Sequence, residues 1–266
     1  MHMNHKKTFV FVLLVFVVGT AMLFAHPVSE NKTKRIGIIS AMDNEIELLL
    51  SNAEIERVDE IGGFVFNVGK LCGDDVVIVK AGIGKVYASG GAATMFCNYD
   101  IDHVIFTGVA GGVGDDTHVL DMVIATDLVS HDYGTVTDEG FYWRDEYSEE
   151  TNGRIYCDPG LVEVASLSAK QVLGEDRVFT GTIVTGDQFI SSSWYVQYLQ
   201  EEFNALACEM EGASVAAICR MFKIPCVVIR TMSDKADGVA RETYEFMMDI
   251  AADNSCKVVM QMLEYI

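Results

Sequence analysis

Residues 103–116, HVIFTGVAGGVGDD, contain the pattern that decides the fold, a short run of β-branched and aromatic residues that ends in glycines. Such a run, bounded by turn residues, predicts a buried β-strand. Similar runs recur along the chain, and several are apolar on both faces, as expected for strands covered by helices on each side of a sheet. Strands are predicted over HVIFTG (103–108), RIGIIS (35–40), FVFNVG (64–69), VVIVKA (76–81), MVIAT (122–126), VFTGTIV (178–184), ALACE (205–209) and CVVIR (226–230).

Segments with the helical period lie between these strands. They cover 43–51, 85–97, 160–173, 193–203, 211–222 and 242–264. Alternation of strands and helices predicts the α/β class. The region 35–266 contains neither linker composition nor an internal repeat. We therefore expect a single domain over 35–266, with a central β-sheet flanked by helices.

A polar, aromatic-rich stretch interrupts this alternation at 130–159, SHDYGTVTDEGFYWRDEYSEETNGRIYCDP. It has neither the strand period nor the helix period, so no regular element is predicted there. A connection of this length in a compact domain is usually functional, mobile or covered by another subunit. Two hypotheses stay open for its aromatic part, 131–147: packing against a partner subunit, or an exposed loop.

The chain has 266 residues, with 19 Lys and Arg against 39 Asp and Glu and a formal net charge of −20. Phosphate backbones repel such a charge, which argues against nucleic acid as a partner. Hydrophobic residues make up 50 % of the chain and Pro occurs 3 times. This composition suits one sizeable core and not a disordered chain.

Neither the cysteines nor the histidines form a metal-ligand pattern. The 7 cysteines contain no C-x-x-C pair, so neither a zinc site nor a redox motif is indicated. Most of them lie inside apolar runs, which predicts that they are small buried hydrophobes. His103, His118 and His131 are not spaced as metal ligands. The sequence therefore predicts no metal and no organic cofactor.

The first 25 residues differ from the rest of the chain. Lys6 and Lys7 precede an uncharged apolar run at 8–25, and a polar spacer at 26–34 follows. A positive start, an apolar run and a small residue at Ala25 are the parts of a secretory signal peptide. The run also reaches the lower length limit for a spanning helix, about 18 residues. We expect 1–25 to be a signal peptide or an uncleaved membrane anchor, and favour an exported protein, periplasmic or secreted, over a cytoplasmic one.

Two glycine-rich segments fail as phosphate-binding loops. VKAGIGKVY (79–87) has Val79 and Val86 where the Walker pattern needs Gly and a hydroxyl residue. FTGVAGGVGDD (106–116) has no three glycines at G-x-G-x-x-G spacing. Sites for nucleoside triphosphates and dinucleotides are therefore not supported. The glycines permit either close approach of the backbone to a small ligand or a structural turn.

Four acidic residues follow predicted strands. Glu45 comes after the first strand, near a helix start where the helix dipole favours a carboxylate. Glu209 and Glu211 follow the strand ALACE, and Asp234 follows the strand CVVIR. Ligands in open α/β sheets bind beyond the carboxyl ends of the strands, so together these acids form a candidate site. Each acid alone is better explained as a helix cap or a solvated side chain, and only the shared placement of all four favours a site.

Six segments in order resemble the 5′-methylthioadenosine/S-adenosylhomocysteine nucleosidases of the purine nucleoside phosphorylase superfamily. They lie at family-like spacing over residues 35–264: AMDNE (41–45), AGIGKV (81–86), TGVAGG (107–112), TGDQFI (185–190), CEMEGAS (208–214) and RTMSDKAD (230–237). The resemblance implies a nucleoside phosphorylase-like domain with a central mixed β-sheet and a homodimer with segment 131–147 at or near the interface. It also implies hydrolysis of 5′-methylthioadenosine and S-adenosylhomocysteine, and of 5′-deoxyadenosine, with release of adenine.

The same resemblance implies which residues carry the chemistry. At matching positions, Glu45 holds and deprotonates the attacking water, and Arg230 lies near that water. Asp234 donates to purine N7, and Ser233 helps to orient it. Breaking the N-glycosidic bond needs a proton donor at the purine and a base for water on the opposite face of the ribose. Two separated carboxylates do the same in inverting glycoside hydrolysis.

Further positions are implied to bind the substrate. Glu211 grips the ribose hydroxyls, with Met210 against the sugar and Glu209 beside it. Phe189 stacks on the adenine, and the backbone of Ile190 reads its Watson–Crick edge. The remaining pocket positions are Met42, Ile83, Val109, Ala110 and Tyr244, and Val109 departs from the family because many members have Ser there.

Three alternatives remain open. A nucleoside phosphorylase would need cationic groups for phosphate, and the corresponding places here hold Ser40, Asp43, Asn44, Glu45 and Phe106. An aminofutalosine-type nucleosidase cannot be separated by sequence. A surface binding protein that keeps the fold is suggested by the leader, although every acid that the chemistry needs is present.

Overall fold

The computed structural model describes residues 35–143 and 153–266. The leader predicted at 1–25, its spacer at 26–34 and residues 144–147 of the predicted interface lie outside the described residues. The elements in chain order are β1 (Arg35–Ser40), α1 (Glu47–Asn52), β2 (Glu54–Ile61), β3 (Phe64–Leu71), β4 (Asp74–Lys80), α2 (Lys85–Asn98), β5 (Ile101–Gly112), β6 (Met122–Ser130), β7 (Gly134–Thr137), β8 (Gly140–Trp143), β9 (Ile155–Tyr156), α3 (Pro159–Leu173), the short 3-10 helix η1 (Glu175–Arg177), β10 (Val178–Thr185), α4 (Ser193–Phe203), β11 (Ala205–Glu209), α5 (Gly212–Phe222), β12 (Cys226–Asp234) and α6 (Ala240–Met262).

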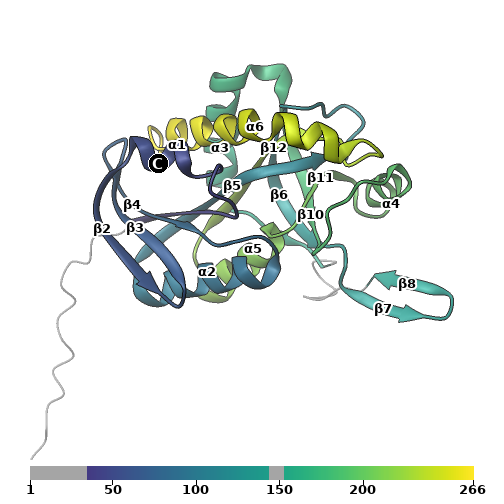
Figure 1. Ribbon diagram of the computed structural model, residues 1–266, viewed down its shortest axis with the longest axis horizontal. Helices are drawn as coiled ribbons and strands as arrows, with labels where there is room; N and C mark the ends of the chain where they lie inside the picture. The colour runs from purple at the N-terminus through teal and green to yellow at the C-terminus, as the bar shows by residue number, and fades with distance from the viewer. Residues whose placement is uncertain (1–34, 144–152) are drawn as a thin grey trace, which may run out of the picture. The chain divides into compact units, whose positions relative to one another are not determined.

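A mixed sheet forms the centre of this domain, with strand order β11-β10-β6-β12-β5-β1-β4-β3-β2 (Figure 1). The strands β12, β5, β1 and β4 are parallel to one another, and β6 joins them in antiparallel pairing with β12. The second half of β5 also pairs with β11, where Ala207 and Cys208 face Gly112 and Gly111. This last pairing curls one side of the sheet and places the end of β11 beside β5.

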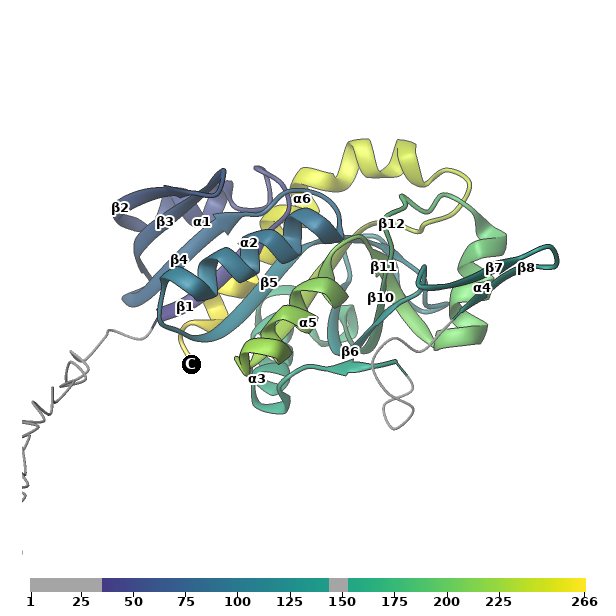
Figure 2. The same cartoon turned by 90° about the horizontal axis from the view of Figure 1, so that it is seen from below.

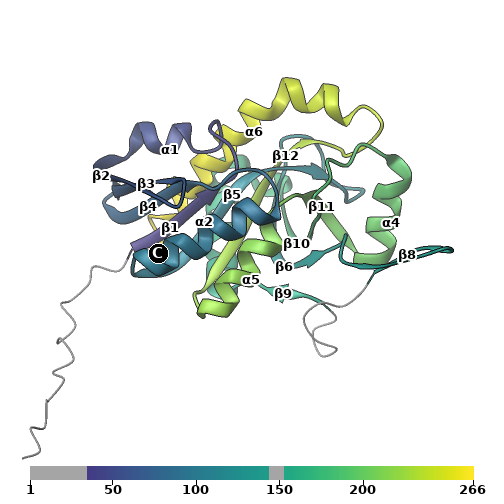
Figure 3. The same cartoon turned by 60° about the horizontal axis from the view of Figure 1, so that its bottom comes forward.

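Helices cover both faces of the sheet (Figures 2 and 3). Successive strand residues point to opposite faces, and the buried residues follow that alternation. In β5, Val104 and Phe106 pack with α2 and α5, whereas Ile105 packs with α1, α3 and α6. A third, smaller cluster joins α4 to Val129 and Val184 at the curled side. The α/β class and the central mixed sheet flanked by helices are confirmed.

Three local predictions differ from the structure. β2 was not predicted, because its sequence EIERVDEI carries charges on both faces, and it lies at the edge of the sheet. The stretch 130–159 contains the β7–β8 hairpin and the short strand β9. These strands have 4, 4 and 2 residues, which is too short for a periodic pattern to reveal them. Cys72 and Cys97 are exposed, whereas the other five cysteines are buried.

No helix in the described part of the chain is long and apolar enough to cross a membrane.

Candidate active site

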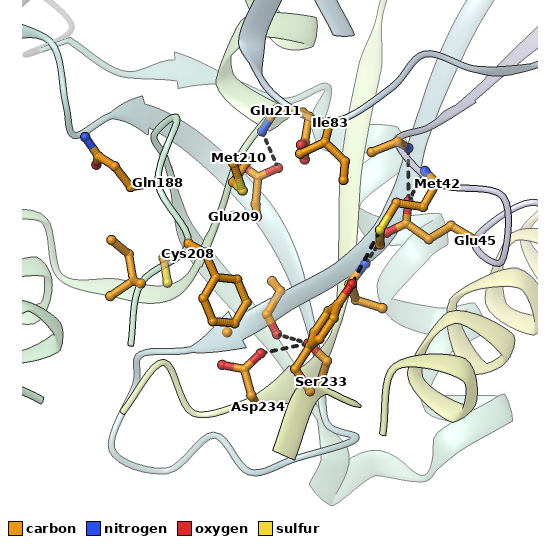
Figure 4. A pocket seen from close by; sticks show the side chains of 17 residues that line it. Met42, Glu45, Ile83, Gln188, Cys208, Glu209, Met210, Glu211, Ser233 and Asp234 are labelled. Carbon is orange, nitrogen blue, oxygen red and sulfur yellow. Dashed lines mark hydrogen bonds between the residues drawn. The ribbon is translucent and has the colours of Figure 1, made fainter. Parts of the chain in front are cut away.

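One pocket of about 170 Å³ brings together segments that are far apart in the sequence (Figure 4). The loops after β1, β4, β10 and β11 contribute to it, together with β5, the ends of β11 and β12 and the start of α6. The prediction assumed an open sheet with parallel strand ends. In the structure the acids also lie close together, but for a different reason. Strand β11 pairs antiparallel with β5, and Gly111 of β5 lies opposite both Cys208 of β11 and Asp234 of β12. Its lining residues are Ala41, Met42, Glu45, Ile83, Val109, Ala110, Gly111, Gln188, Phe189, Ile190, Cys208, Glu209, Met210, Glu211, Ser233, Asp234 and Tyr244.

Glu45 is held at one side of this pocket by backbone donors. Its Oε2 accepts hydrogen bonds from the N–H groups of Ala41 at 3.0 Å and Met42 at 2.9 Å. Its Oε1 accepts one from the Val109 N–H at 2.9 Å. Its position near a helix start suggested that the carboxylate caps α1. It does not, because its hydrogen bonds go to Ala41, Met42 and Val109. The N–H of Val109 supplies a donor that does not depend on the side chain at this position.

Burial decides the acidity of Glu45. It is buried, and desolvation raises the pKa of its carboxyl above the usual value, although the Arg230 charge and three N–H donors act in the opposite direction. A carboxylate with a raised pKa is a better base for water than an exposed one. Gly108 permits the close approach of Glu45 and Arg230, because a Cβ there would overlap Oε1 of Glu45 and lie 2.8 Å from Nη1 of Arg230.

Asp234 lies at another side of the pocket, beside Ser233 (Figure 4). Its Oδ1 accepts a hydrogen bond from the Ala236 N–H at 2.7 Å, and its Oδ2 accepts one from the Ser233 hydroxyl at 2.9 Å. Ala236 has a φ of 53°, in the left-handed region, which turns its N–H back toward the carboxylate. Burial raises the pKa of Asp234 above its usual value despite these two donors.

Arg230 is buried and does not line the pocket. Its Nη2 donates to Oε2 of Glu209 at 2.6 Å and lies 3.7 Å from Oε2 of Glu211. Its guanidinium carbon is 4.2 Å from the centre of the Phe106 ring. Within 35–143 and 153–266, Nε and Nη1 have no hydrogen-bond partner. Burial opposes the Arg230 charge, but the three nearby carboxylates hold its pKa above the usual value.

Glu209 and Glu211 differ in their surroundings although they are two residues apart. Glu209 accepts hydrogen bonds from the Thr185 hydroxyl, from the Glu211 N–H at 3.0 Å and from the Gly212 N–H at 2.7 Å. Its oxygens are therefore occupied by the protein. Glu211 instead accepts the Gly84 N–H at 2.8 Å through Oε1. Burial and then the charge of Glu209 raise the pKa of Glu211.

Aromatic side chains form the wall opposite the acids of β11. The rings of Phe189 and Tyr244 meet edge to face with centres 5.7 Å apart. The Tyr244 hydroxyl donates to Sδ of Met42 at 3.4 Å. Phe189 is 48 % exposed and lines the pocket, so part of its side chain is accessible to a ligand. Such an apolar wall beside convergent polar groups is typical of a small-molecule site.

The structure gathers thirteen of the fourteen predicted site residues around this pocket, and Arg230 is the exception. It adds Ala41, Gly111, Gln188 and Cys208. All four lie inside the motifs quoted above, AMDNE, TGVAGG, TGDQFI and CEMEGAS, so their position in a motif is a signal for them. No group of His, Cys, Asp or Glu side chains in the described ranges is arranged to hold a metal ion.

Comparison with known proteins agrees with this geometry. The model of the phosphorylase superfamily matches residues 35–264. The 5′-methylthioadenosine/S-adenosylhomocysteine nucleosidase of Aeromonas salmonicida is 36 % identical over 86 % of this chain and 98 % of its own length. The aminodeoxyfutalosine nucleosidase of Helicobacter pylori is 32 % identical over 87 % of this chain and 99 % of its own length.

Solved structures give the same result. The 5′-methylthioadenosine/S-adenosylhomocysteine nucleosidase of Neisseria meningitidis, crystallised with methylthio-immucillin-A, superposes with a TM-score of 0.80 at 35 % identity, covering 88 % of this chain and 100 % of that one. The futalosine hydrolase of Helicobacter pylori superposes with a TM-score of 0.79 at 30 % identity, covering 88 % and 99 %. The chain belongs to the phosphorylase superfamily and, within it, to the family of 5′-methylthioadenosine/S-adenosylhomocysteine nucleosidases.

Proposed function

We propose that this enzyme hydrolyses the N-glycosidic bond of 5′-methylthioadenosine and S-adenosylhomocysteine, and of 5′-deoxyadenosine, and releases adenine. The observation that carries the proposal is the placement of two buried acids with raised pKa values, Glu45 and Asp234, at different sides of one pocket (Figure 4). Cleavage of a purine nucleoside by water needs one base and one acid on opposite faces of the sugar.

The base in this proposal is Glu45. Ionised Glu45 takes a proton from a water molecule that approaches C1′ of the ribose, while the nearby Arg230 supplies positive charge. The backbone donors on Glu45 fix its direction, so that little reorganisation accompanies the proton transfer.

The acid is Asp234. Protonated Asp234 donates to N7 of the purine as the glycosidic bond breaks, so that adenine leaves without a full negative charge. Burial keeps the proton on Asp234 at a higher pH than an exposed aspartate would allow. Ser233 holds the carboxyl in place through its 2.9 Å hydrogen bond.

The remaining lining residues bind the two halves of the nucleoside. Glu211 accepts hydrogen bonds from the ribose hydroxyls through Oε2, while Met210 packs on the sugar. Glu209 orients Arg230 and the backbone of Glu211. The adenine stacks on Phe189 and meets the backbone of Ile190. Met42, Ile83 and Tyr244 surround the sugar and its 5′ substituent, and Val109 and Ala110 form the floor.

Water suits this site better than phosphate as the nucleophile. A phosphate dianion needs cationic donors; the nearby Arg230 is already ion-paired with Glu209, and Glu45 supplies negative charge at the place where the nucleophile approaches. Release of adenine from methylthioadenosine by the purified protein, with and without added phosphate, tests the proposal. Equal release in both samples supports it, and release that depends on phosphate, or none at all, contradicts it.

A second substrate is favoured by one observation. The aminodeoxyfutalosine nucleosidase of Helicobacter pylori is similar over nearly its whole length. Aminodeoxyfutalosine is an adenine nucleoside whose 5′ group is larger than the methylthio group of methylthioadenosine. The ratio of kcat/KM for aminodeoxyfutalosine and methylthioadenosine decides between the two substrates, and a ratio above one would make the first the preferred one.

We further propose that the enzyme is a homodimer with the described part of segment 131–147 at the interface. The β7–β8 hairpin extends away from the main sheet (Figure 1). Its apolar side chains are exposed, with Val136 at 79 %, Tyr142 at 50 % and Phe141 at 40 %. Exposed apolar side chains on a projecting hairpin are typical of an interface.

Export through residues 1–25 is likewise a proposal that rests on the sequence. The N-terminus of the protein recovered from the producing cells tests it. A chain that starts after Ala25 supports a cleaved leader, a full-length chain in the membrane fraction supports an anchor, and a full-length chain in the cytosol contradicts both.

A further inference from the structure

Three charged residues outside the pocket join two of its walls. Nζ of Lys85 donates to Oδ1 of Asp132 at 2.6 Å and lies 3.8 Å from Oδ2 of Asp187. The Asp187 N–H donates to Oδ2 of Asp132 at 2.9 Å, and the Lys85 N–H donates to Oδ1 of Asp187 at 2.8 Å. Each residue therefore contacts the other two. We call this ring of contacts the Lys85 cluster.

Each member of the Lys85 cluster adjoins a different structural element around the pocket. Lys85 begins α2 and directly follows Gly84, whose N–H holds Oε1 of Glu211. Asp187 directly precedes the lining residues 188–190. Asp132 lies between β6 and the β7–β8 hairpin. None of the three lines the pocket, and the proposed chemistry uses none of them.

The backbone at Gly84 and Lys85 is held by Asp187, which lies on a different segment. Gly84 has a φ of 92°, in the left-handed region that favours glycine. A Cβ at Gly84 would lie 3.1 Å from Oδ1 of Asp187, so the two segments are in close contact. The carboxylate of Asp187 also accepts from the first N–H of α2, where a negative charge is stabilising.

The positive charge of Lys85 is what allows Asp132 and Asp187 to lie close together. The Asp132 side chain is 11 % exposed and that of Lys85 is 25 % exposed, so solvent screens this pair incompletely. Burial raises the pKa of Asp132, but the hydrogen bonds from Lys85 and from the Asp187 N–H outweigh it, and the pKa lies below the usual value. Without Lys85, two carboxylates would face each other between the walls and repel.

We propose that Lys85 is a positioning residue, which holds the Gly84 loop and residues 188–190 together through Asp132 and Asp187 and thereby sets the geometry in which Glu211 and Phe189 bind the nucleoside. The inference rests on the proposed function. The two reacting acids take their donors from other segments, Ala41, Met42 and Val109 for Glu45 and Ser233 and Ala236 for Asp234. Loss of Lys85 therefore weakens binding more than it slows the chemical step.

The test compares kcat and KM for methylthioadenosine in four single variants and in the double variant of Lys85→Met with Asp132→Asn. Lys85→Met removes the charge and keeps much of the side-chain volume, Lys85→Arg keeps the charge, and Asp132→Asn removes the partner. Lys70→Met is the matched control, because Lys70 makes a 3.1 Å ion pair with Asp75 on strands away from the pocket. The thermal unfolding midpoint of each variant is measured alongside.

The expected result is a KM about tenfold higher for Lys85→Met, equal to about 1.4 kcal/mol, with kcat within threefold of wild type. Lys85→Arg stays within threefold in KM, and the control stays within twofold. In the Asp132→Asn background, Lys85→Met adds less than twofold, because both changes remove the same contact.

Other results would overturn the inference. A KM for Lys85→Met within twofold of wild type, a fall in kcat at unchanged KM, or a full tenfold rise in the Asp132→Asn background each contradicts it. A wild-type protein that releases no adenine contradicts the proposed function instead. The same comparison is then made on the dissociation constant of unreacted methylthioadenosine, with the same ratios expected.

Discussion

The Ser233 hydroxyl lies 2.9 Å from Oδ2 of Asp234 and 3.2 Å from the carbonyl oxygen of Ala110. One hydroxyl proton thus has two acceptors. When Asp234 is ionised, Ser233 donates to it. When Asp234 carries a proton on Oδ2, the Ser233 hydroxyl can accept a hydrogen bond from that O–H and donate its own to the Ala110 carbonyl. The site therefore accommodates both states of the acid that the proposed reaction passes through.

Asp234→Asn tests the role of this acid. Asn keeps the shape of the side chain but has no carboxylic proton for N7, so we expect kcat for adenine release to fall by about 10²–10⁴-fold. KM should change less, because Asn can still hydrogen-bond the purine. Spectrophotometric release of adenine measures both, and turnover equal to wild type would remove Asp234 from the mechanism.

Glu45→Gln tests the base. Gln can keep the donors from Ala41 and Met42 on its oxygen but loses the negative charge that accepts the proton from water. We expect kcat to fall by about 10²–10⁴-fold. Bound methylthioadenosine should then survive long enough for its dissociation constant to be measured by calorimetry. A variant that cleaves the substrate at the wild-type rate is incompatible with Glu45 as the base.

The pH profile of kcat/KM follows from two raised pKa values. Glu45 must be ionised, so activity falls as the pH decreases through its pKa, which lies above the 4.5 of an ordinary glutamate. Asp234 must be protonated, so activity falls as the pH increases through its pKa, which lies above 3.8. The profile is therefore bell-shaped. The alkaline limb should be absent from the residual activity of Asp234→Asn, and its persistence there would assign it to another group.

Arg230→Met tests the buried ion pair with Glu209. The change leaves Glu209 buried without its cation, although three other donors remain. We expect the free energy of unfolding to fall by about 3–5 kcal/mol. Arg241→Met is the control, since its pair with Glu245 spans 3.8 Å at the surface and should contribute about 0.5 kcal/mol or less. Urea denaturation measures both, and equal losses would show that the Arg230 pair is no more important than a surface pair.

The hairpin prediction concerns assembly. Val136 and Phe141 face each other across β7 and β8 and are exposed. Introducing Asp at both positions should convert a dimer into a monomer, because a carboxylate is costly to bury in an apolar contact. Val58→Asp on the edge strand β2 is the control. Analytical ultracentrifugation gives the masses, and a wild-type monomer, or a dimer that survives both changes, argues for an exposed loop instead.

The sequence predicted the interior of the fold better than its edges. Buried strands such as β5 and β12 are recognisable because apolar residues on both faces leave no other place for them. β2 carries charges that a partly exposed edge strand tolerates. Among the described residues, β7 and β8 pair with each other and with no other strand, so their stability depends on contacts that no local pattern encodes.

The site was predictable where a motif carries it. Glu45, Glu211 and Asp234 lie in segments whose residues match the family in order and spacing. The Lys85 cluster was not predictable, because Lys85 and Asp132 are 47 positions apart and meet only through the curl of the sheet. The expected place of Arg230 near the water stays a prediction, whereas its 2.6 Å ion pair with Glu209 depends on how β12 and β11 lie in the fold, which a sequence does not reveal.

A crystal structure of the protein with an unreactive methylthioadenosine analogue tests the central claim most directly. The account predicts that the Asp234 carboxyl lies within hydrogen-bond distance of purine N7. It also predicts a water molecule between Glu45 and the opposite face of C1′. Both acids on one face of the sugar, or a purine bound away from Asp234, would contradict it.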